Sequence, residues 1–206
     1  MAVIRSYSGN HTINGPVSGV IRLHQLGIGG PTWVNGTIHG LTPGYHGMAI
    51  ANLGDLTKGC NGAPEHFDPL TQAHGSILSS IRHCGDLGNV LASKNGTAVF
   101  AYKVHLLLRI TGIHGVIGRM LMIGANPDDL GRCSLNQTCS ANDTRTEISP
   151  VDGNIGPYVG CGIIGIAGDY SILDRASDGT RIFYSKTPFM ILAILIATKL
   201  FVQNRM

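Results

Sequence analysis

The chain has 206 residues, of which 43% are hydrophobic and 13% are charged, and its formal net charge is +3. This length can hold one domain with a sizeable core, plus a tail. The lysines and arginines are scattered, without basic runs interleaved with aromatic residues, so nucleic-acid binding is not expected.

Short segments of alternating or apolar residues recur along the chain and predict β-strands. The expected strands cover residues 17–26, 32–41, 45–53, 89–93, 97–108, 115–125 and 160–168. The turn at Lys94–Gly96 contains Asn-Gly, a strong local indicator of a β-hairpin. The spacing of these segments favours an all-β fold, either an antiparallel sandwich or a Greek-key barrel.

Two long segments, Asn52–Asp86 and Asn126–Gly156, lack a strand pattern. Long loops inside a compact domain are usually functional or disordered, and the first of these carries clustered histidines. Three imidazoles and one carboxylate make a closed four-coordinate set suited to structural zinc. We therefore expect a metal to order this loop through four residues: His66, His74, His83 and Asp86.

After residue 168 the composition changes, so we expect a folded domain over 1–168 and a polar linker with a hydrophobic tail over 169–206. Small residues at Ser177–Gly179, a polar spacer and the apolar run Phe189–Val202 follow the pattern of a GPI-anchor signal. The run is short for a transmembrane helix and is interrupted by Lys199, so membrane contact is expected only through a lipid anchor.

Five Asn-x-Ser/Thr sequons predict a glycoprotein: Asn10, Asn35, Asn95, Asn136 and Asn142. With the tail, they favour an extracellular or cell-surface-anchored protein. The first ten residues do not have the pattern of a secretory signal peptide, so a cytoplasmic location is the alternative.

Seven motifs occur in an order that resembles the Cu/Zn superoxide dismutase family: GPTWVNGTIHGLTPGYHG, GDLTKGC, HFDP, RHCGDLGNV, VIGR, DDLG and GCGIIGIA. The resemblance runs from about Val3 to Ala167. It implies an eight-stranded Greek-key β-barrel with a zinc-binding loop and a second long loop over the active site. The four expected zinc ligands match the zinc loop of that family.

The family's copper site does not match this sequence. The resemblance places His66 as the ligand that bridges the two metals, and places the other three copper ligands at Ala49, Ala51 and Gly124, which offer no donor atom. Met48 neighbours these positions but should point to the opposite face of its strand. We therefore expect zinc and no copper.

A guidance arginine of the family falls on Tyr158, which is neutral and supplies no steering field. Zinc has one oxidation state and cannot replace copper in dismutation. These substitutions predict an inactive homologue rather than an enzyme. The alternative is a superoxide dismutase with an altered metal site.

The resemblance also implies a disulfide between Cys60 and Cys161, and a carboxylate, Asp128, that supports the zinc ligand His74. His46 and Arg119 match structural positions. The inserted Cys133 and Cys139 form either a local disulfide or two free thiols, and Cys84 is expected to be a buried thiol.

Family members pair partly through their last strand and a Gly-Asp turn, which matches Gly54 and Asp55. The expected partners are a second copy, another family member or the copper chaperone of the family. The sequence therefore predicts a zinc-stabilised module for binding and dimerisation.

Overall fold

The computed structural model of the protein describes residues 1–6, 15–27, 29–104, 107–133, 139–140 and 143–167. The chain divides into two units, Met1–Ile166 and Ala167–Met206, and the fold belongs to the first. The predicted anchor segments and three of the sequons, Asn10, Asn136 and Asn142, lie outside the described residues. Within the described ranges, no helix is both long and apolar enough to cross a bilayer.

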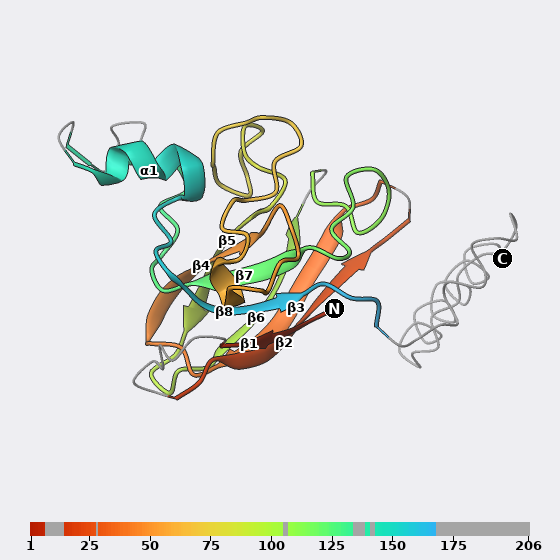
Figure 1. Ribbon diagram of the computed structural model, residues 1–206, viewed down its shortest axis with the longest axis horizontal. Coiled ribbons are helices and arrows are strands. Elements are labelled where there is room, and N and C mark those ends of the chain that lie inside the picture. The colour runs from red at the N-terminus through yellow and green to blue at the C-terminus, as the bar shows by residue number, and fades with distance from the viewer. Residues whose placement is uncertain (7–14, 28, 105–106, 134–138, 141–142, 168–206) are drawn as a thin grey trace, which may run out of the picture. The chain divides into compact units, whose positions relative to one another are not determined.

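The described residues form a closed antiparallel barrel, in the order β1-β2-β3-β6-β5-β4-β7-β8 (Figure 1). This topology confirms the predicted all-β, eight-stranded Greek-key fold. The strands are β1 (Ala2–Arg5), β2 (Ser18–Gln25), β3 (Thr32–His39), β4 (Gly44–Ile50), β5 (Asp86–Ala92), β6 (Ala98–Val104), β7 (Met120–Gly124) and β8 (Tyr158–Ile163).

Strand β1 was not expected from the sequence, because four residues are too few for a clear pattern. Ala2 and Ile4 are fully buried and alternate with the more exposed Val3 and Arg5. The strand pairs with β2 along its length and with β8 at Arg5, so it closes the barrel.

The predicted hairpin joins β5 to β6. The amide of Ser93 donates to the carbonyl of Thr97, and the amide of Gly96 donates to the carbonyl of Ser93. Gly96 has φ of 76°, the left-handed conformation that glycine adopts without a steric penalty. The turn needs this freedom at Gly96.

From His46 onward, strand β4 is buried on both faces, and two different cores lie around it. Met48 and Ile50 point into the barrel with the main hydrophobic core. Ala49 and Ala51 point outward into a second buried cluster, which lies under the loops. The side-chain alternation of a strand thus separates a packing face from a face available for a site.

The two long segments meet beside the barrel. The first contains a short 3₁₀ turn at Gly59–Asn61, and the second contains helix α1 (Arg145–Asp152), where no element was expected. The amide of His74 on the first donates to the carbonyl of Pro150 on the second, at 2.8 Å. The sequence indicators of this helix are a Thr-x-x-Glu start and Gly153 just after its end, while Pro150 inside it is a residue that disfavours a helix interior.

Candidate metal centre

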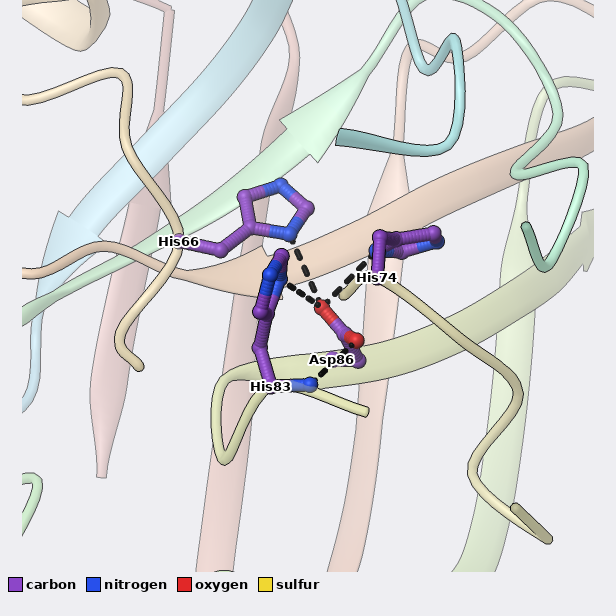
Figure 2. A group of neighbouring side chains, drawn as sticks. All are labelled: His66, His74, His83 and Asp86. Carbon is purple, nitrogen blue, oxygen red and sulfur yellow. Dashed lines mark hydrogen bonds and ion pairs between the residues drawn. The ribbon is translucent and has the colours of Figure 1, made fainter. Parts of the chain in front are cut away.

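Four side chains, three from one loop and one from the strand that follows it, converge beside the barrel (Figure 2). Asp86 begins β5, whereas the three histidines belong to the loop between β4 and β5. His66 is held next to β4, because it forms an isolated antiparallel bridge with Ala51. All four residues are buried.

The three imidazoles face one carboxylate oxygen. The distances from Asp86 Oδ1 are 2.9 Å to Nδ1 of His66, 2.9 Å to Nδ1 of His74 and 3.1 Å to Nδ1 of His83. The other oxygen of Asp86 accepts hydrogen bonds from the amides of Gly75, at 3.0 Å, and His83, at 2.9 Å. Asp86 thus organises the whole loop.

Asp86 remains ionised in this position. Burial alone would raise the pKa of its carboxyl group, but hydrogen bonds with the three imidazoles outweigh this and hold the pKa well below its usual value. A buried carboxylate surrounded by imidazole nitrogens is a set of ligands suited to binding a metal cation.

The residues present fit zinc. Their ligand atoms lie within 4.8 Å of one another, and three nitrogens and one carboxylate oxygen are ligands that zinc commonly takes. Such a set is closed, without a position for substrate, so zinc here would hold the loop to β5. The predicted residues His66, His74, His83 and Asp86 are the ones that the structure brings together.

Asp128 supports this set from outside. Its Oδ1 lies 2.7 Å from Nε2 of His74 and accepts the amide of Leu130, also at 2.7 Å. The side-chain amide of Asn89 on β5 donates to the carbonyl of Asp128, and the amide of Asp128 donates to Asn89 Oδ1. This pairing holds the backbone of Asp128 in place, and its carboxylate then orients the His74 ring.

Zinc uptake should release protons. Burial lowers the pKa of His74, but hydrogen bonds to Asp128 and Asp86 on its two nitrogens outweigh this and raise it to about 10. The metal-free ring is therefore protonated at neutral pH, and zinc must displace the proton on Nδ1. We expect about one proton released per zinc at pH 7 and an affinity that rises with pH toward 10. Calorimetry in buffers of different ionisation enthalpy measures this number.

The control for this measurement is Asp128→Asn. The substitution removes one of the carboxylates that hold the proton on His74, so fewer protons should be released at pH 7. Equal proton release in the wild type and in this variant would contradict the assignment of the proton to His74.

The positions expected to have lost copper ligands lie on the outward faces of β4 and β7. Ala49 and Ala51 are fully buried in the second cluster. A side chain at Gly124 has no room, since a Cβ there would lie 2.5 Å from the carbonyl oxygen of Ile155 and 2.8 Å from its Cβ. Only the imidazole of His66 remains to serve a metal, so a four-imidazole copper site does not fit these residues.

His46 has a structural role. Its Nδ1 lies 2.9 Å from the carbonyl of Gly124 on β7, and its Nε2 lies 2.9 Å from the carbonyl of Thr42. Both nitrogens are occupied by backbone groups, and the ring ties β4 to β7. Met48 lies in the main core, away from Ala49.

Tyr158, at the position where the resemblance implies a guidance arginine, is a buried neutral group. Its hydroxyl donates to the carbonyl of Pro64 at 2.9 Å, and burial raises its pKa well above its ordinary value. It therefore carries no charge at physiological pH and contributes no field to attract an anion.

The cysteines form two disulfides, Cys60–Cys161 and Cys133–Cys139. The first ties the loop after β4 to β8, and the second lies within the long insertion. Arg119 supports the first loop, because its guanidinium donates to the carbonyl of Asn52 and stacks 3.6 Å from the ring centroid of Phe67. Cys84 is a buried free thiol in the described part of the chain.

One feature of His66 was not predicted. Its Nε2 is buried and has no hydrogen-bond partner, unlike its Nδ1, which faces Asp86. Figure 2 shows this second nitrogen pointing away from the three other side chains. The only indication in the sequence was the resemblance, which made His66 a ligand shared by two metals.

A family comparison and a comparison with individual proteins point to the same protein family. Residues 17–164 match the family described as copper/zinc superoxide dismutase. A protein of Mesembryanthemum crystallinum named "Superoxide dismutase [Cu-Zn] 2" is 43% identical over 137 residues, which cover 66% of this chain and 80% of that protein.

The comparison corrects the prediction that the chain is an inactive homologue. A relative that is 43% identical across the domain is named a superoxide dismutase, and this contradicts the prediction. The error came from counting the ligands of one coordination geometry. Their loss excludes that geometry, but it does not exclude activity at a different metal site.

Proposed function

The chain belongs to the copper/zinc superoxide dismutase family, and we propose that it dismutes superoxide with an altered metal site. The overall reaction converts two superoxide anions and two protons into dioxygen and hydrogen peroxide. One anion gives up its electron and the other takes one up, so the protein must hold a metal with two accessible oxidation states.

Zinc supplies the framework for this function. It would be held by His66, His74, His83 and Asp86, with Asp128 orienting His74. When bound, zinc neutralises the buried carboxylate and fixes the loop against β4 and β5, but it does not change oxidation state. The redox chemistry therefore needs a second metal, and no step through a four-imidazole copper is derived for this chain.

The observation that carries the proposal is that the two ring nitrogens of His66 have different surroundings. Its Nδ1 faces the zinc set at 2.9 Å from Asp86 Oδ1, while its Nε2 is buried without a partner. An imidazole that ligates zinc through Nδ1 can hold a second ion through Nε2. His66 would thus keep one ligand of an altered redox site next to zinc.

The test is the decay of superoxide followed by stopped-flow absorbance. The protein is loaded with zinc alone, or with zinc plus copper, manganese or iron. A chelator binds the metal that is not held by the protein, so that free metal does not react with superoxide. We expect no acceleration with zinc alone and, with a redox-active metal, a decay rate proportional to protein concentration. The proposal fails if no loaded form is faster than chelated buffer.

We also propose that two barrels pair. Backbone hydrogen bonds from Met120 to Leu53 and from Gly118 to Ile164 bring three chain segments together. The exposed fractions of Leu53, Ile117 and Ile166 in these segments are 60%, 40% and 59%. Such exposed apolar groups favour a partner with the same surface, a second copy or another family member, and the family's copper chaperone is a further candidate.

Sedimentation velocity tests the pairing. Ile117→Asp should convert a dimer to monomers, because it places a charge in the buried centre of the proposed contact. Ile148→Asp is the matched control, since Ile148 is 46% exposed on α1 and outside this surface. A wild type that remains monomeric at every concentration would exclude self-pairing.

The two disulfides support the proposal of an oxidising, extracellular or cell-surface location. Asn35 and Asn95 are exposed, which suits glycosylation. Glycosidase treatment and release from cells by a GPI-cleaving phospholipase test this proposal, and a protein recovered only from cytosol would refute it.

A further inference from the structure

The Nε2 atom of His66 is a candidate metal ligand, because it is buried and has no hydrogen-bond partner. Across the described residues, His66 Nε2 is the one buried side-chain nitrogen or oxygen without a hydrogen-bond partner. His66 is 6% exposed. Leaving such a group unpaired is unfavourable, so buried polar groups usually have a protein, water or ion partner.

Strand register places His66, Met120 and Met122 on the same face of the sheet, with the small side chains of Ala49 and Ala51 between them. His66 pairs with Ala51, Ala49 pairs with Met122 on β7, and the amide of Ala51 donates to the carbonyl of Met120. Paired residues present their side chains on the same face of a sheet. Ala49, Ala51, Met120 and Met122 are all fully buried in one cluster, whereas Met48, Leu121 and Ile123 point into the barrel core.

This cluster offers sulfur rather than oxygen or nitrogen. The sulfurs of Cys60 and Cys161 are joined in a disulfide, and the Tyr158 hydroxyl donates to Pro64. The thioethers of Met120 and Met122 remain as donors. A buried water needs two to four polar partners, and these side chains do not supply them. Thioether sulfur with imidazole nitrogen is instead a donor set for a soft monovalent cation.

We propose that His66 Nε2, Met120 and Met122 form a site for a soft monovalent cation, cuprous copper in the working protein. The site rests on the proposed function, because it names the ligands and the metal class of the altered redox centre. It differs from a four-imidazole site in its donors, two thioethers and one imidazole, and such donors favour the cuprous over the cupric state.

Silver(I) is the probe, since it is a soft monovalent ion without redox activity under these conditions. Zinc-loaded protein with ¹³C-labelled methionine methyl groups is titrated with silver and followed by NMR, in a Cys84→Ala background because a free thiol binds silver. We expect the Met120 and Met122 methyl resonances to shift, with saturation at one equivalent. The Met48 resonance should stay in place.

Matched substitutions separate binding from folding. Met122→Leu preserves volume and should weaken silver binding at least about ten-fold, since it removes a thioether ligand. Met48→Leu lies on the same sheet but faces the barrel core, and it should bind silver like the wild type. Thermal melts check that both variants are folded.

Each result decides one claim. Unshifted Met120 and Met122 resonances, or equal silver affinity in the two leucine variants, would overturn the site, even if the protein dismutes superoxide with another metal. Stoichiometric silver binding at these methionines in a protein that never accelerates superoxide decay would keep the site and overturn the proposed function.

Discussion

Replacing Asp86 with asparagine should remove zinc and destabilise the metal-free protein by about 3–5 kcal/mol, the cost of breaking a buried charged network. Asp86 is fully buried, and it accepts from two backbone amides while facing three imidazoles. An asparagine amide has one acceptor oxygen, so its NH₂ group must face either the backbone amides or the ring nitrogens. The loop loses both its charge and part of its hydrogen bonding.

Urea unfolding of chelated protein and metal analysis of the isolated protein measure these two effects. Glu65→Gln is the control, because Glu65 is an exposed carboxylate on the same loop next to His66. The assignment of Asp86 as the organising residue would be wrong if Asp86→Asn kept one zinc and a stability within about 1 kcal/mol of the wild type.

Removing the Cys60–Cys161 disulfide should cost about 4–5 kcal/mol, whereas removing Cys133–Cys139 should cost about half as much. The cysteines of the first bridge are 101 residues apart and those of the second are six apart. A crosslink that closes a longer loop removes more conformational freedom from the unfolded chain.

Unfolding of the Cys60→Ala/Cys161→Ala and Cys133→Ala/Cys139→Ala double variants, both zinc-loaded, measures the difference. Because both variants lose one disulfide and two cysteines, the comparison cancels the effects of replacing cysteine with alanine. Equal losses in the two variants would show that loop length does not control their stability.

The all-β class and the zinc set could be predicted from local patterns, whereas the eight-stranded Greek-key barrel was implied by the resemblance to the family. Alternating apolar residues defined most strands, and the four zinc residues occupy one segment and its junction with β5. Strand β1 was missed because it is short, and α1 because Pro150 lies inside it.

What could not be predicted depends on contacts between distant segments. The collision of Ile155 with a side chain at Gly124 arises where the second long loop approaches β7. The shared face of His66, Met120 and Met122 depends on the register of β4 with β7 and on an isolated bridge. The inactive-homologue prediction failed for a related reason, since it considered only the positions that hold ligands in the family.

Ile155 occupies space that a four-imidazole site would need. A Cβ at Gly47 would lie 2.9 Å from the Cβ of Ile155, and one at Gly124 would lie 2.8 Å from the same atom, so this isoleucine fills the space above two glycines on neighbouring strands. A side chain at 124 would also lie 2.5 Å from the carbonyl oxygen of Ile155. A smaller residue at 155 would remove the side-chain contact and leave the backbone contact, so a histidine at 124 also requires the second loop to move its backbone away from β7.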